Sequence, residues 1–171
     1  INEVLDLSKI EAGQMAIELA SFQPKPVILS AIDIIKHAMA ERGIIMHTDL
    51  SEEIPEIFAD RARLKQAIIN LLSNAVKYNS DNVDIFVSTL YKEETVKVCI
   101  NVKDTGPGLS SEECQGLFEK FNRLGAENKN IEGTGLGLYV TKKMLNEMHM
   151  DIVVKSKKGF GTQFSIKIPV K

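Results

Sequence analysis

Residues 61–79 read RARLKQAIINLLSNAVKYN and predict a long helix with two different faces. Apolar residues recur there at helical steps of three and four, which indicates a face buried in a core. These are Leu64, Ala67, Ile68, Leu71, Leu72, Ala75 and Val76. A polar stripe of Gln66, Asn70, Asn74 and Lys77 runs beside them. The helix is therefore expected to join a hydrophobic core to a line of amide side chains.

The two asparagines of this stripe predict a metal site. Asn is unfavourable inside helices because its amide competes for backbone hydrogen bonds. The presence of Asn70 and Asn74 one turn apart therefore requires an explanation. Their carbonyl oxygens can ligate Mg²⁺, which takes further ligands from phosphates and water. Lys77 is predicted to contact phosphate oxygens. Taken alone, this helix is better explained by a solvated polar flank, and the metal site gains support only beside the glycine runs that follow.

Two glycine-rich runs, DTGPGL at 104–109 and GTGLGL at 133–138, predict backbone that lies close to a ligand. The second run leads into a helical apolar pattern over 138–148. The free N–H groups at the start of a helix suit phosphate. The residues expected to contribute are Gly106, Gly108, Gly133, Gly135, Leu136, Gly137 and Leu138. A single run of this kind would also fit a tight turn.

Asp104 ends a predicted strand over 96–102, in which apolar and polar residues alternate. A carboxylate only accepts hydrogen bonds, so it suits the exocyclic amine of adenine and not the carbonyl oxygen of guanine. We therefore expect ATP to be preferred over GTP. The alternative role for Asp104 is turn initiation before glycine.

The order of these motifs resembles the catalytic ATP-binding domain of sensor histidine kinases, within the GHKL ATPase superfamily. The resemblance covers about residues 22–171. The stretches that carry it look like the asparagine box at 71–78, the first glycine box at 104–109, the phenylalanine box FEKF at 118–121, the second glycine box at 133–138 and the GFGT segment at 159–162.

The resemblance implies transfer of the γ-phosphoryl group of Mg·ATP to a histidine on a helical hairpin, with relay to the receiver domain of a response regulator. It implies that Asn70 and Asn74 hold Mg²⁺ and that Tyr78 and Thr162 line the nucleoside. The catalytic groups would be Asn74, Lys77 and Arg123, with Lys77 and Arg123 on the phosphates.

The segment 110–132 resembles the family's ATP lid, and Arg123 resembles its phosphate-contacting arginine. Phe118 and Phe121 are expected to anchor this segment in the core. Residues 148–151 lack the paired glycines usual in the family, so no left-handed glycine is expected to end the preceding helix.

Residues 1–13 look like the end of the second helix of the family's dimerisation and phosphoacceptor hairpin. We expect residues 1–16 to belong to that hairpin and 17–171 to form the catalytic domain. The first residue is Ile, so we expect a fragment cut inside the hairpin, without the acceptor histidine, from a homodimeric protein. The histidines present, His37, His47 and His149, match no phosphoacceptor motif.

The composition agrees with a cytoplasmic domain. The net charge of −2 with 26% charged residues argues against nucleic-acid binding. Cys99 and Cys114 lack metal or redox spacing and are interpreted as reduced thiols. No apolar run reaches membrane-spanning length, so a membrane tether of the full-length protein would lie outside this sequence.

The predicted fold is an α+β two-layer sandwich, with a mixed, mostly antiparallel sheet of about five strands on three helices and an additional N-terminal helix. Strands are expected at 44–50, 57–59, 83–90, 95–102, 152–156 and 163–168, and helices at 1–16, 26–42, 61–79 and 138–148. Two other functions share these motifs: a serine kinase of the anti-sigma type, and a nucleotide-binding regulatory module without transfer activity.

Overall fold

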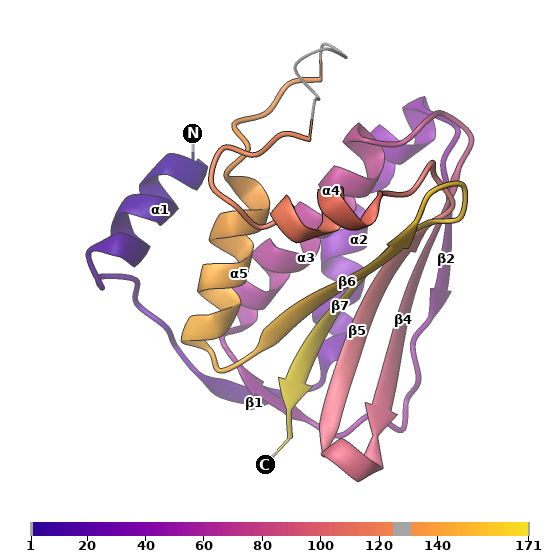
Figure 1. The fold of residues 1–171 in the computed structure, drawn as a ribbon. Coiled ribbons are helices and arrows are strands. Elements are labelled where there is room, and N and C mark those ends of the chain that lie inside the picture. Colours follow the sequence, from indigo (N-terminus) through magenta and orange to yellow (C-terminus); the bar gives the residue numbers. More distant parts are fainter. Residues whose placement is uncertain (1, 125–130, 171) are drawn as a thin grey trace.

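The computed structural model describes residues 2–124 and 131–170, and it has two layers, a five-stranded sheet with helices on one face (Figure 1). The helices are α1 (Asn2–Glu11), α2 (Pro24–Glu41), α3 (Arg61–Lys77), α4 (Ser111–Gly116) and α5 (Gly137–Glu147), with a short 3₁₀ turn at Glu93–Thr95. The strands are β1 (Ala20–Phe22), β2 (Ile45–Asp49), β3 (Ile57–Ala59), β4 (Asp84–Lys92), β5 (Lys97–Asp104), β6 (Asp151–Lys157) and β7 (Gly161–Pro169). The predicted α+β sandwich is confirmed.

The main sheet has the strand order β2-β4-β5-β7-β6. β2 runs parallel to β4, and the other neighbours are antiparallel. Both predicted hairpins, β4–β5 and β6–β7, are present. β1 and β3 pair separately as a small antiparallel sheet.

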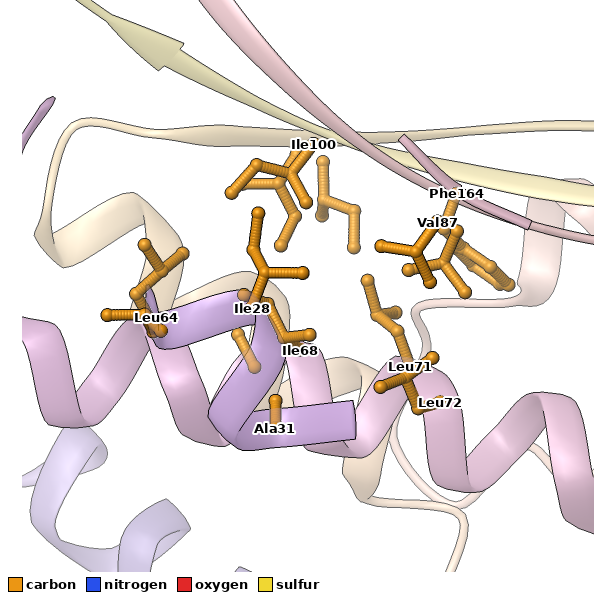
Figure 2. Close-up of a cluster of buried hydrophobic side chains, with 14 of the residues drawn as sticks. Ile28, Ala31, Leu64, Ile68, Leu71, Leu72, Val87, Ile100 and Phe164 are labelled. Carbon is orange, nitrogen blue, oxygen red and sulfur yellow. The ribbon is translucent and has the colours of Figure 1, made fainter. Parts of the chain in front are cut away.

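The core lies between the sheet and helices α2 and α3 (Figure 2). The apolar face predicted for α3 is fully or almost fully buried along its length. It meets the inward residues of the central strands, among them Val87, Ile100 and Phe164. This contact fixes the rotation of α3, so the polar stripe beside the core face points toward the neighbouring helices, where Gln66 bonds α1 and Asn70 bonds α5.

Local signals explain where the helices begin. Pro24 occupies the first turn of α2, where a missing N–H costs nothing, so this helix starts two residues before its predicted start at Pro26. Asp60 caps α3 by accepting a 3.0 Å hydrogen bond from the Arg63 N–H. The helix α4 was not predicted, although Ser110 and Glu113 form a reciprocal capping box at its start.

Left-handed residues follow three of the helices, α1, α2 and α5. Gly13 follows α1, which is shorter than predicted, and Gly43 follows α2, with φ of 64° and 63°. His149 takes the same position after α5 with φ of 58°. The N–H groups of His149 and Met150 bond the carbonyls of Asn146 and Leu145 at 2.9 Å, which is a Schellman motif. The turn that lacks the family's glycines therefore keeps the usual geometry, with histidine in the strained position.

Within residues 2–124 and 131–170, no helix has both the length and the apolar character needed to cross a membrane.

Candidate functional site

A pocket of about 390 Å³ opens between α3, the start of α5, the loop after β5 and the β6–β7 turn. This volume is in the range of small-molecule sites. Most of the predicted site residues line it: Asn74, Lys77, Tyr78, Asp104, Gly108, Arg123, Gly133, Gly135, Gly137, Leu138 and Thr162. Asn70, Gly106 and Leu136 do not. Motifs up to about ninety residues apart in the sequence thus meet around one cavity.

The α3 stripe enters the pocket at its C-terminal end. Asn74 is partly buried and lines the pocket, and no hydrogen bond to its amide occurs within the described residues. Lys77 and Tyr78 follow at the rim and are exposed. A β-carbon added to Gly133 would lie only 3.2 Å from the Tyr78 hydroxyl oxygen. The end of α3 and the second glycine run are therefore in contact here.

Asn70 sits one turn deeper and is held from α5. Its amide nitrogen donates a 2.7 Å hydrogen bond to the hydroxyl of Thr141, which is buried. Its carbonyl oxygen faces Gly137 and would be 2.9 Å from a β-carbon there. The oxygen of Asn70 therefore points toward the first turn of α5, behind the wall of the pocket.

Asp104 is buried at the end of β5, on the same face of the sheet as the core residues Val102 and Ile100. Its Oδ1 accepts a 2.9 Å hydrogen bond from the Gly106 N–H. No group in the described part of the chain hydrogen-bonds its Oδ2. Thr162 lies directly opposite on β7. The carboxylate thus keeps one acceptor oxygen for a ligand in the pocket.

Close backbone contacts require glycine at two positions beside Asp104. A β-carbon on Gly161 would collide with the Asp104 carbonyl oxygen, and one on Gly108 would collide with the Lys157 carbonyl oxygen. Both glycines also have φ in the left-handed region, at 88° and 69°. The first glycine run is therefore pressed against the β6–β7 turn, which closes this side of the pocket.

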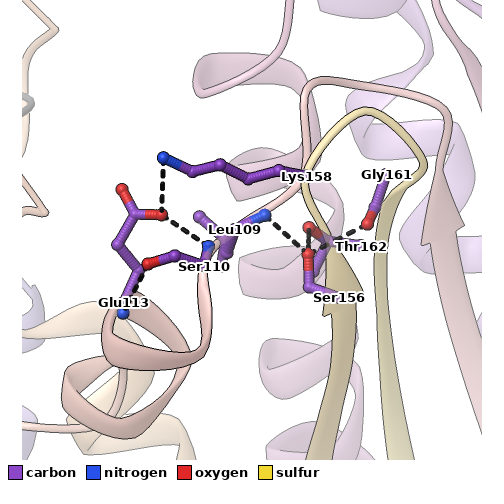
Figure 3. A network of polar contacts seen from close by, with 7 residues as sticks. All are labelled: Leu109, Ser110, Glu113, Ser156, Lys158, Gly161 and Thr162. Carbon is purple, nitrogen blue, oxygen red and sulfur yellow. Dashed lines mark hydrogen bonds and ion pairs between the residues drawn. The ribbon is translucent and has the colours of Figure 1, made fainter.

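Polar contacts tie the segment after the first glycine run to the same turn (Figure 3). The Leu109 N–H donates to Ser156 Oγ at 2.8 Å, and Ser156 Oγ lies 2.8 Å from the Thr162 hydroxyl. Lys158 Nζ and Glu113 Oε2 are 3.9 Å apart. The start of the predicted lid is therefore attached to the sheet on the side where Thr162 enters the pocket.

The predicted lid is described up to Leu124 and again from Ile131; its residues 125–130 lie outside the described part of the chain. Arg123 lines the pocket and donates from Nη2 to the Ile131 carbonyl, while its buried Nε has no partner among the described residues. Phe118 packs against the core with its ring edge-on to Phe164, as predicted. The prediction for Phe121 was wrong, because it is 66% exposed with φ of 59°.

Two ionisable groups near the lid have shifted pKa values. Burial, together with the nearby Glu113 carboxylate, raises the pKa of the Cys114 thiol. A hydrogen bond to Glu11 raises the pKa of the Lys120 ammonium, which therefore stays charged. Neither group lines the pocket.

Several pocket residues were missed from the sequence. The polar ones are Glu3, Asn79, Glu113, Asn122, Thr134 and Lys158. Asn79 could have been noticed as a third asparagine close after Asn70 and Asn74, and its Nδ2 donates a 2.7 Å hydrogen bond to the Ala75 carbonyl. Glu3 gave no such signal, because only the docking of α1 brings it to the pocket.

Comparison with known proteins agrees with this geometry. Residues 59–171 match the family model described as histidine kinase-, DNA gyrase B-, and HSP90-like ATPase. The chain belongs to this ATPase family. The matched region includes α3, both glycine runs and the β6–β7 hairpin, and so all of the pocket except Glu3.

Individual relatives are histidine kinases. The chain is 33% identical over 168 residues to signal transduction histidine-protein kinase BarA of Escherichia coli K12, covering 96% of this chain and 18% of that protein. It is 34% identical over 173 residues to sensor histidine kinase RcsC of Salmonella typhimurium, covering 99% and 18%. The chain thus spans less than a fifth of either relative. A crystal structure of full-length ShkA with AMPPNP has a TM-score of 0.86 and 25% identity, covering 98% of this chain and 34% of that one.

Proposed function

We propose that this chain is the catalytic ATP-binding part of a sensor histidine kinase, which transfers the γ-phosphoryl group of ATP to a histidine on a helical hairpin. One observation carries the proposal: Asn74, Asp104 and the first turn of α5 surround a single pocket, although they lie on separate elements. The histidine kinases BarA and RcsC, which align with nearly the whole chain, support the same activity.

The roles follow from the positions of the side chains. The free oxygen of Asp104 accepts from the adenine amine, and Thr162 and Tyr78 border the nucleoside. The N–H groups at the start of α5 receive the phosphates, because no helical carbonyl precedes them as a partner. Lys77 and Arg123 neutralise the charge that builds on the phosphates during transfer.

The residues present fit Mg²⁺ as the metal of this site. The side-chain amide of Asn74 lines the pocket and has no hydrogen-bond partner in the described chain. The Asn70 oxygen faces Gly137, at the N-terminal end of α5. Amide oxygens together with phosphates are ligands of the kind that Mg²⁺ prefers. When bound, the ion would neutralise phosphate charge and orient the transferred group.

The acceptor is proposed to be a histidine of the hairpin to which α1 and residues 1–16 would belong, in a homodimeric protein, with residues 17–171 as the catalytic domain. In the transfer, the bond from the γ-phosphorus to the bridging oxygen breaks, a bond to the imidazole nitrogen forms, and ADP leaves. The receiver domain of a response regulator would then take the phosphoryl group onto an aspartate. His37, His47 and His149 do not line the pocket.

The test uses γ-³²P-labelled ATP with Mg²⁺. The chain alone is expected to acquire no label, and a separate chain carrying the complete hairpin is expected to gain acid-labile phosphate when this chain is added. Transfer should be slow, because the tether that raises the effective concentration is missing. Acid-stable label, as on serine, or label on His37, His47 or His149 would contradict the proposal. The variant Asn74→Ala serves as the inactive control.

A further inference from the structure

The helix α1 places a carboxylate inside the pocket. Glu3 lines the cavity, and the hydroxyl of Thr134 donates a hydrogen bond to its Oε2. Its Oε1 would lie 3.0 Å from a β-carbon on Gly137, the first residue of α5. The carboxylate therefore stands at the N-terminal end of α5.

This end of α5 is a position where an anion is favoured. The first intrahelical bond is donated by the Val140 N–H, at 2.8 Å to the Leu136 carbonyl, so the N–H groups before it have no helical partner. The residue preceding the helix supplies no side-chain cap. The partial positive charge of a helix N-terminus stabilises carboxylates and phosphates alike.

Glu3 is held there without a cation. Within the described residues it takes part in no ion pair. Its contacts are the Thr134 hydroxyl and the first turn of α5, next to the Asn70 oxygen. The start of α5 and the Asn70 oxygen are groups that the proposed function assigns to the phosphates and the metal.

Two further contacts hold α1 in this place. Asp6 is buried and accepts a 2.6 Å hydrogen bond from Gln66 Nε2, with Arg63 Nη1 at 3.6 Å. At the other end of the helix, Lys120 pairs with Glu11. Figure 1 shows α1 lying alongside α5, on the side away from the sheet. The polar side of α1 is thus fitted to α3, to α5 and to the segment after α4.

We propose that Glu3 is a built-in competitor of the nucleotide: with α1 docked, its carboxylate occupies the place of a phosphate at the start of α5, and ATP must displace it to bind. The proposal rests on the proposed function, since it assumes that ATP binds in this pocket. It makes ATP binding and the docking of α1 oppose each other, and by linkage each weakens the other equally.

The test is calorimetric titration of ATP, with and without Mg²⁺, into the unmodified chain, Glu3→Gln and Glu18→Gln. Glu3→Gln removes one negative charge beside the phosphates and is expected to bind ATP about tenfold more tightly, equivalent to about 1.4 kcal/mol, in both conditions. Glu18→Gln is the matched control, because it makes the same charge change at an exposed carboxylate of the N-terminal segment, outside the pocket and outside the contacts that hold α1. Its affinity is expected to stay within about twofold.

The possible outcomes separate the explanations. Weaker Mg·ATP binding by Glu3→Gln would make Glu3 a metal ligand and overturn the competitor role. An equal gain in both variants would reduce the effect to net charge and overturn it as well. If the unmodified chain binds ATP and Glu3→Gln binds it with the same affinity, the competitor role of Glu3 is also overturned. No ATP binding by any of the three proteins would overturn the proposed function itself.

Hydrogen exchange gives a second readout. Saturating ATP is expected to increase exchange of the α1 amides in the unmodified chain, because Glu3 is displaced, while the buried core of α3 stays protected. In Glu3→Gln, ATP is expected to change α1 exchange much less. Unchanged or greater protection of α1 in the ATP-bound unmodified chain would contradict the competition.

Discussion

The side-chain amide of Asn70 is fixed by a 2.7 Å hydrogen bond to the hydroxyl of Thr141. The bond connects α3 to α5 at the level where the pocket ends, and it leaves the Asn70 oxygen facing Gly137. One of the two asparagines predicted to hold Mg²⁺ thus depends on a partner from another helix, whereas Asn74 faces the pocket directly.

Replacing Thr141 with Val should test whether the orientation of Asn70 matters for magnesium binding. The variant leaves the Asn70 amide without its partner, which should cost about 1 kcal/mol of the free energy of unfolding. It should also reduce the amount by which Mg²⁺ strengthens ATP binding, measured by calorimetry. Thr141→Ser, which keeps the hydroxyl, is the control. If Mg²⁺ strengthens ATP binding by Thr141→Val as much as by the unmodified chain, the orientation of Asn70 is irrelevant to the metal.

Replacing Asn74 with Ala should remove most of the magnesium dependence of ATP binding. The free energy of unfolding without ligand should change by no more than about 0.5 kcal/mol, since Asn74 flanks the buried face of α3 and its side chain makes no hydrogen bond in the described chain. Asn146→Ala, an exposed asparagine on α5, is the control. A large loss of stability would instead assign Asn74 a structural role.

Replacing Asp104 with Asn should lower the affinity for ATP. The oxygen that receives the Gly106 N–H can be retained, but an NH₂ group then faces the adenine amine. Loss of a charged hydrogen bond should cost about 1.5–3 kcal/mol, read from the dissociation constants of ATP and GTP. The preference for ATP over GTP should shrink. Equal ATP affinity in the two proteins would refute the adenine role.

Replacing His149 with Gly should stabilise the domain by up to about 1 kcal/mol, because the left-handed position after α5 strains a residue with a β-carbon. Denaturant unfolding measures this change. Gly43→Ala, which puts a β-carbon at the equivalent position after α2, should destabilise the domain. ATP affinity should be unaffected by His149→Gly, since His149 lies outside the pocket. A loss of stability in His149→Gly would show that the imidazole contributes more than the strain costs.

Much of the fold could be predicted because its signals are local. The alternation in β5 places Asp104 on the core-facing side, and the helical period of α3 separates Asn74 from the buried face. The less accurate predictions concern segments whose state depends on distant contacts. Phe121 is apolar yet exposed, and it has a left-handed backbone conformation that no local pattern marks.

The sequence by itself determined the long helices α2, α3 and α5, the order of the strands along the chain and the chemical groups of the nucleotide site, since these follow from periodicity, glycine spacing and side-chain type. Only the tertiary structure decided which of these groups share the pocket. It directs Asn70 behind the wall through Thr141 and presses Gly108 and Gly161 against neighbouring carbonyls. It also brings Glu3 to the start of α5. Such placements depend on how helices and strands pack across long sequence separations, and residue spacing carries no information about that packing.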